Sequence, residues 1–114
     1  MIIALDFDRT ILDTDNPEPG HKMGAPLPGA VESIQRLYDM GHKIVIHSCR
    51  ANEGQRSIKV MTDWLNHFQI PYHSIWGESS SDIGKIVADC YVDDRGLQFI
   101  SWEDVLEKLD WYGR

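Results

Sequence analysis

Two aspartates, Asp6 and Asp8, follow a short apolar run at the start of the chain. The run Ile2–Leu5 begins with β-branched residues, which predicts a buried strand that ends where the acids begin. In an extended chain, residues two apart point to the same side, so we expect the two carboxyl groups to lie near each other. Neighbouring carboxylates repel each other unless a cation or a shared proton relieves them. The pair therefore indicates a magnesium site, with an Asp-rich turn as the alternative.

A second acidic pair, Asp93 and Asp94, follows an apolar run at 89–92, and Ser48 follows the run Lys43–His47. Open α/β sheets carry their chemistry just outside the carboxyl ends of their strands. Those ends share one edge of a parallel sheet, so side chains that follow three different strands should gather there. The group comprises Asp6, Asp8, Thr10, Ser48, Asp93 and Asp94. Two acidic pairs gathered in this way are difficult to explain as unrelated surface turns.

The elements that position these residues follow from hydrophobic periodicity. Strands are predicted at 2–5, 43–47, 72–76 and 89–92, and helices at about 30–38, at 53–67 and from 101 onward, with a short helix or turn at 83–87. A capping box at 101–104 opens the last helix, whose aromatic residues we interpret as core or as a subunit contact. Because strands alternate with helices, we expect one domain over 1–114, an α/β/α sandwich around a mostly parallel, Rossmann-like sheet.

Composition narrows the classes of partner. A formal net charge of −7 argues against a nucleic acid partner and is compatible with a cation site. No basic region is followed by a long apolar run at the N-terminus, and no run reaches membrane-spanning length, so we expect neither a signal peptide nor a membrane partner. Cys49 and Cys90 are the two cysteines, and we interpret them as reduced thiols of a cytoplasmic protein.

Two polar segments are candidates for substrate specificity. Residues 11–27 are rich in Pro, Gly, Asp and Asn, which predicts an irregular flap beside the end of the first strand. The flap contains His21, a candidate substrate contact. Residues 77–82 form a second polar loop. Neither segment identifies the substrate, so sugar phosphates, nucleotides and phosphoproteins all remain open.

The pattern resembles the haloacid dehalogenase superfamily in its phosphatase branch. The first motif of that family, Asp-x-Asp-x-Thr after a strand, matches residues 6–10. The second motif, a Ser or Thr at a strand end, matches Ser48, and the third, a Lys upstream of the last motif, matches Lys85. The acidic pair Asp93-Asp94 matches the fourth. The four motifs occur in the family's order and cover most of the chain.

The resemblance implies a phosphomonoester hydrolase in which Asp6 is the nucleophile and forms an aspartyl-phosphate. Asp8 would be the general acid toward the leaving group and then the base for water. Ser48 would hydrogen-bond a phosphate oxygen, and Lys85 would offset charge, with Lys59 as a less favoured third-motif lysine. Thr10 would brace the first-motif loop beside the substrate.

The resemblance also implies Mg²⁺, held by Asp6, the main-chain carbonyl of Asp8 and an acid of the fourth motif. The sequence does not decide between Asp93 and Asp94 as that ligand. Arg50 follows Ser48 by two positions and could pair with the substrate phosphate or with an acid of the site.

The gaps between the motifs leave no room for a cap domain, so we expect a capless enzyme. Such a site is open to bulky substrates or is roofed by a neighbouring subunit, and small capless relatives often form homo-oligomers. Two other readings remain: a receiver-like signalling domain, and a non-catalytic protein that binds phosphate or metal on the same fold. A third alternative keeps the chemistry but makes the substrate a nucleic acid end.

Overall fold

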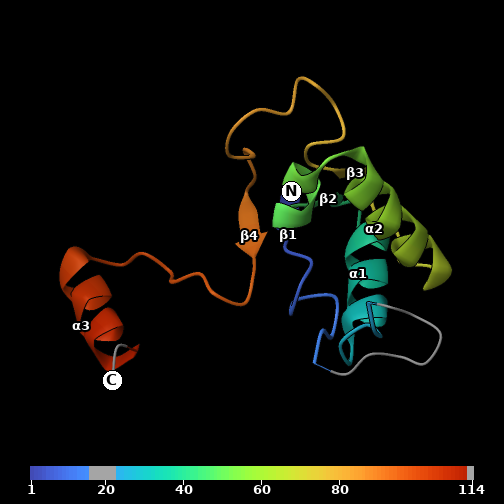
Figure 1. The fold of residues 1–114 in the computed structure, drawn as a ribbon. Coiled ribbons are helices and arrows are strands. Elements are labelled where there is room, and N and C mark those ends of the chain that lie inside the picture. The colour runs from blue at the N-terminus through green and yellow to red at the C-terminus, as the bar shows by residue number, and fades with distance from the viewer. Residues whose placement is uncertain (16–22, 113–114) are drawn as a thin grey trace.

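The computed structural model describes residues 1–15 and 23–112 and contains a four-stranded sheet with helices beside it (Figure 1). The sheet order is β3-β2-β1-β4, and every pairing is parallel. This confirms the predicted α/β class and the parallel sheet. The elements are β1 (Ile2–Leu5), α1 (Ala30–Asp39), β2 (Lys43–Ile46), the 3-10 helix η1 (Cys49–Glu53), α2 (Gln55–His67), β3 (Ser74–Ile75), β4 (Cys90–Val92) and α3 (Trp102–Tyr112).

Helices α1 and α2 cover the same face of the sheet. The register pairs Ile3 with Ile44 and Leu5 with Ile46, so these four side chains share that face. They form one core with the apolar face of α2, whose buried residues are Ile58, Met61, Trp64 and Leu65. Both helices follow the spacing of apolar residues expected from the sequence. This core fixes the positions of β1 and β2, and hence of the residues that follow them.

The opposite face of the sheet carries a loop where a helix or a turn was expected. Ala4 and Val45 pack there against Ile86. Residues 83–87 form a bend and no helix. The side chains of Tyr91 and Trp76 hold this loop in place by donating hydrogen bonds to its main-chain carbonyls. The Tyr91 hydroxyl donates to the Ile86 carbonyl at 2.6 Å, and the Trp76 indole donates to the Gly84 carbonyl at 3.0 Å. This folding back of the chain brings Lys85 to the face that adjoins β1 and β4.

The base of the flap at 11–27 is tied by main-chain hydrogen bonds. The Asp13 amide donates to the Ala25 carbonyl at 2.8 Å, and the Leu27 amide donates to the Ile11 carbonyl at 2.8 Å. The remainder of the flap at 16–22, including His21, lies outside the described residues.

Helix α3 lies apart from the sheet, at the end of an extended connection (Figure 1). The Cα radius of gyration is 15.4 Å, whereas a compact chain of this length has about 13 Å. The expected cap is present, since the Ser101 hydroxyl accepts a hydrogen bond from the Asp104 amide at 3.1 Å. Trp102 is 71% exposed, so its interpretation as a core residue is wrong within this chain. Within the described ranges, no helix is long and apolar enough to span a membrane.

Candidate functional site

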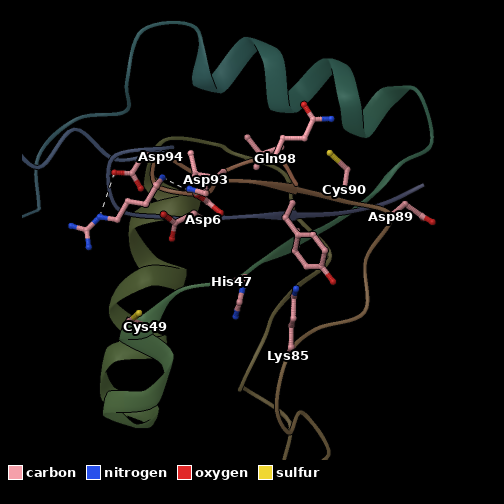
Figure 2. Close-up of a pocket in the computed structure, with 15 residues that line it drawn as sticks. Asp6, His47, Cys49, Lys85, Asp89, Cys90, Asp93, Asp94 and Gln98 are labelled. Atoms are coloured by element: carbon pink, nitrogen blue, oxygen red, sulfur yellow. Dashed lines mark hydrogen bonds and ion pairs between the residues drawn. The ribbon is translucent and has the colours of Figure 1, made fainter. Parts of the chain in front are cut away.

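The carboxyl ends of β1 and β4 place Asp6 beside the second acidic pair. The Asp6 amide donates to the Val92 carbonyl at 2.9 Å, which continues the sheet pairing one residue past β1. Asp6 lines a pocket of about 890 Å³ together with His47, Lys85, Asp93 and Asp94 (Figure 2). Four of the residues expected from sequence therefore meet in one pocket, at the predicted edge of the sheet.

Burial and two neighbouring acids alter the electrostatic environment of Asp6. Burial is the main factor that raises its pKa above the ordinary value of 3.8. A hydrogen bond from the Phe7 backbone opposes this, while a side-chain hydrogen bond with Asp94 and the charges of Asp94 and Asp93 raise the pKa further. The arrangement thus holds a carboxylate against two others, which is unfavourable without a cation or a proton between them.

The two acids after β4 differ in what they contact. The Asp93 carboxylate accepts hydrogen bonds from the amides of Arg95 and Gly96 and so closes a turn. A Cβ at Gly96 would lie 3.0 Å from that carboxylate, so the glycine leaves room for this close contact. The Asp94 side chain is only 24% exposed and lies 3.9 Å from the Arg95 guanidinium. Asp93 is therefore engaged by its own turn, whereas Asp94 interacts with Asp6.

Lys85 reaches the same pocket from the loop on the opposite face of the sheet. Its ammonium lies 4.7 Å from the centre of the Tyr91 ring, at cation–π distance. Lys59 instead pairs with Asp63 at 2.9 Å on the exposed side of α2. Of the two candidate lysines, Lys85 and Lys59, it is therefore Lys85 that lines the pocket.

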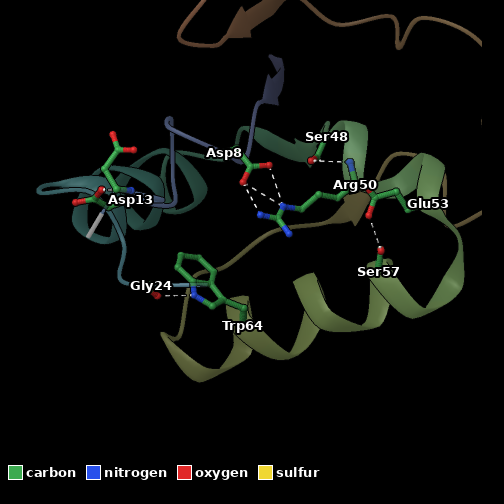
Figure 3. Close-up of polar contacts among 9 residues, drawn as sticks. Asp8, Asp13, Gly24, Ser48, Arg50, Glu53, Ser57 and Trp64 are labelled. Carbon is green, nitrogen blue, oxygen red and sulfur yellow. Dashed lines mark hydrogen bonds and ion pairs between the residues drawn. The ribbon is translucent and has the colours of Figure 1, made fainter. Parts of the chain in front are cut away.

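Asp8 forms a separate contact with Arg50 beside the pocket (Figure 3). The guanidinium donates to both carboxylate oxygens, at 2.8 to 3.1 Å. This hydrogen bonding is the main factor that raises the pKa of Arg50, and burial opposes it. Arg50 was predicted to pair with the substrate phosphate or with an acid of the site, and in the structure it pairs with the acid Asp8.

Ser48 explains how Arg50 is oriented. The Ser48 hydroxyl accepts a hydrogen bond from the Arg50 amide at 3.1 Å and caps η1 (Figure 3). Ser48 is buried, at 7% exposure. Asp8, Ser48 and Arg50 form a second cluster, and none of the three lines the pocket that contains Asp6.

Thr10 lies in a tight loop that main-chain hydrogen bonds close. The Phe7 carbonyl accepts from the amides of Thr10, Ile11 and Leu12 at 3.0 to 3.4 Å, and Arg9 has a left-handed φ of 63°. The buried Thr10 hydroxyl has no hydrogen-bond partner among the described residues. The loop is therefore braced by its backbone, and the bracing role expected for the Thr10 side chain is wrong, because its buried hydroxyl makes no hydrogen bond to the described residues.

Two residues that line the pocket, His47 and Tyr91, were not among the site residues predicted from the sequence. His47 directly follows β2, at a position where a histidine is more often a packing or solvated residue. Tyr91 pairs with Ala4 in the strand register, so its side chain lies on the same face of the sheet as Lys85 and reaches the pocket. Alternation along β4 is the signal that would have placed Tyr91 there.

In the described part of the chain, no group of three or more His, Cys, Asp or Glu side chains is arranged to hold a metal ion. The close acidic contact involves two side chains, Asp6 and Asp94. Any cation at this edge would therefore also need main-chain carbonyl or solvent oxygens.

Comparison with known proteins supports the fold. No protein-family model and no curated protein matches the chain. A conserved protein from Bacteroides thetaiotaomicron is similar, with a TM-score of 0.67 and 23% identity over 98% of this chain and 91% of that one. A protein from Vibrio cholerae has a TM-score of 0.55 and 20% identity over 98% of this chain and 99% of that one. At these identities the likeness establishes the fold alone.

The raised pKa of Asp6 predicts a pH-dependent stability difference. Between pH 3.8 and the higher pKa of the folded state, the folded protein binds more protons than the unfolded chain. Its free energy of unfolding should therefore fall as pH rises through this interval. In chelator, we expect Asp6→Asn to be more stable than the wild type at neutral pH, with the difference disappearing in acid. Urea unfolding across a pH series measures this.

The control for this comparison is Asp39→Asn, which changes an exposed carboxylate that bonds Gln35 at the end of α1. This variant removes one carboxylate outside the pocket, so it separates the environment of Asp6 from the loss of a single negative charge. A wild type more stable than Asp6→Asn at neutral pH would contradict the electrostatic account.

Proposed function

We propose that this protein is a magnesium-dependent phosphomonoester hydrolase that acts through an aspartyl-phosphate on Asp6. The observation that carries the proposal is the contact of Asp6 with Asp94, two acids from different strand ends. Burial, and after it the hydrogen bond with Asp94 and the charge of Asp94, raise the pKa of Asp6. Such a pair is costly for folding and suits a divalent cation. The order of the four sequence motifs adds independent support.

The residues present fit Mg²⁺. Asp6 and Asp94 offer hard carboxylate oxygens, and the main-chain carbonyl of Asp8 would be the third protein ligand. Asp93 is engaged with the Arg95 and Gly96 amides, so we assign it a supporting role. When bound, the ion would neutralise the charge that otherwise separates the Asp6 carboxylate from a phosphate.

The chain's own groups supply the two chemical steps. An Asp6 oxygen attacks phosphorus as the bond from phosphorus to the leaving oxygen breaks, and Asp8 gives its proton to that oxygen. A water molecule then attacks phosphorus in the aspartyl-phosphate, and Asp8 takes a proton from that water. The bond between phosphorus and the Asp6 oxygen breaks and releases phosphate. Lys85 offsets negative charge in the pocket throughout.

Arg50 must change partner during this sequence. Its guanidinium occupies both carboxylate oxygens of Asp8, whereas the first step requires an Asp8 oxygen that is free to give a proton to the leaving group. An incoming phosphate is a second anion that can bind the same guanidinium. Exchange of Arg50 from Asp8 to the phosphate would release Asp8 at the moment when substrate arrives.

The Asp8–Arg50 contact also favours a second candidate function. With both Asp8 oxygens engaged, the protein could bind a phosphate or a metal ion without turnover. In this alternative, the acidic pocket is a binding site on the same fold.

The decisive assay measures phosphate release from an aryl phosphate, with Mg²⁺ and with chelator. We expect release with Mg²⁺, none with chelator, and full recovery when Mg²⁺ is restored.

Asp8→Asn should lower the rate of phosphate release by roughly 10²- to 10⁴-fold, because general acid–base catalysis contributes that much. If the wild type binds Mg²⁺ in calorimetry but turns over neither aryl phosphate nor a panel of sugar phosphates, nucleotides and phosphopeptides, the binding function replaces the hydrolase.

A further inference from the structure

Strand β4 is exposed on both faces, unlike a normal strand of a parallel sheet. Such strands are usually buried under helices. Here Tyr91 and Val92 point to opposite faces and are 42% and 41% exposed. Val87, just before β4, is 85% exposed. We call these three residues the β4 surface, which lies around the edge strand of the sheet. Helices α1 and α2 pack over β1 and β2 on the face to which Val92 points, and Tyr91 points to the opposite face.

Helix α3 carries an apolar stripe that contacts no other helix or strand closely. Trp102, Leu106 and Leu109 recur at helical spacing and are 71%, 67% and 52% exposed. The connection before the helix adds Phe99 and Ile100, which are 61% and 66% exposed. We call these five residues the α3 stripe. A stripe of this kind stabilises a helix only when it packs against another apolar surface.

The course of the chain after β4 carries α3 away from its own sheet. The amides of Arg95 and Gly96 bond the Asp93 carboxylate and turn the chain as it leaves the strand. The connection to Ser101 then runs outward, and α3 lies at its far end (Figure 1). In this conformation both apolar surfaces of one chain are exposed to solvent.

The exposed area matches what a dimer would bury. The α3 stripe of one chain presents on the order of several hundred Å², since a large aromatic side chain alone presents about 150–250 Å². Reciprocal contact buries both stripes and both β4 surfaces, which approaches the roughly 1,200–2,000 Å² of stable interfaces. A second copy of this chain supplies both complementary surfaces, and two-fold symmetry satisfies them together.

We propose that two copies of this protein exchange their α3 helices, so that the α3 stripe of each packs on the β4 surface of the other. The contact also completes the pocket. That pocket is lined by Asp6 and Tyr91 on the sheet and by Leu97 and Gln98 on the connection to α3 (Figure 2). The helix of the second copy supplies the missing wall beside Asp6. This proposal does not depend on the reaction assigned to the pocket.

Light scattering after gel filtration tests the dimer. We expect the wild type to be a dimer at micromolar concentration. Leu106→Asp should raise the dissociation constant at least 100-fold with an unchanged far-UV circular dichroism spectrum, because a charge would be buried in the apolar contact. Leu109→Asp provides a second variant if the first fails to fold. The matched control is Met40→Asp, which changes an exposed apolar residue, 63% exposed, beyond α1 and should remain dimeric.

Cross-linking distinguishes exchange from the return of α3 to its own sheet. Cys90 is exposed on β4, so Cys49→Ser with Glu107→Cys leaves one thiol on β4 and one on α3. A flexible bis-maleimide should join two chains on a denaturing gel, and the yield should fall in the Leu106→Asp background. A monomeric wild type, or a dimer in which the reagent joins thiols within one chain, would overturn the proposal.

Discussion

Asp6→Asn should abolish phosphate release while the fold remains intact. The amide has nearly the same shape as the carboxylate but is a poor nucleophile, so the aspartyl-phosphate cannot form. Removal of a catalytic nucleophile costs roughly three to six powers of ten in turnover. The measurement is phosphate release from an aryl phosphate at saturating Mg²⁺, with far-UV circular dichroism to verify folding.

The control is again Asp39→Asn, which removes one exposed carboxylate far from the pocket and should retain wild-type turnover. It separates the loss of the nucleophile from the change of one charge in a protein of net charge −7. If Asp6→Asn retained substantial turnover, the covalent mechanism on Asp6 would be wrong.

Trp64→Ala should cause the largest loss of stability among single substitutions in the core. Trp64 is 1% exposed, packs edge-on against Phe7 at 5.2 Å, and donates its indole proton to the Gly24 carbonyl at 2.9 Å (Figure 3). Truncation of a buried Trp leaves a cavity and an unbonded carbonyl, so the free energy of unfolding should fall by about 3–5 kcal/mol. Urea unfolding followed by circular dichroism measures it.

Val60→Ala is the control on the same helix, because Val60 is 44% exposed and should change stability by less than about 0.5 kcal/mol. The comparison also bears on the site. Phe7, against which Trp64 packs, lies between Asp6 and Asp8 in the sequence and is fully buried. A loss similar to that of Val60→Ala would mean that α2 does not support the loop that carries the two acids.

The sequence predicted the sheet and the edge that carries the acids because both depend on local patterns. Apolar runs that stop at polar residues mark strand ends, and parallel strands bring those ends together. Asp6, Lys85, Asp93 and Asp94 meet in one pocket as expected. Their roles in catalysis, and the magnesium ion, remain predictions.

The details that could not be predicted depend on tertiary contacts. The strand expected at 72–76 is reduced to Ser74–Ile75, which pair with Val45 and Ile46 of β2, while the flanking amides of His73 and Trp76 still donate to β2 carbonyls. The Asp8–Arg50 contact joins residues 42 positions apart, so no spacing rule reveals it. The sequence could not decide whether Trp102 is core or subunit contact, because amphipathic periodicity indicates that a helix face will be covered and not which molecule covers it.

The tied base of the flap has a consequence for how specificity could diversify. Residues 13 and 25, and residues 11 and 27, are joined by main-chain hydrogen bonds, so the chain enters and leaves this segment at fixed points. For a closed loop in general, each doubling of its length adds only about 0.6 kcal/mol of closure entropy. Because the tied ends set where the chain enters and leaves this segment, its length can change while the sheet and its acids stay in place.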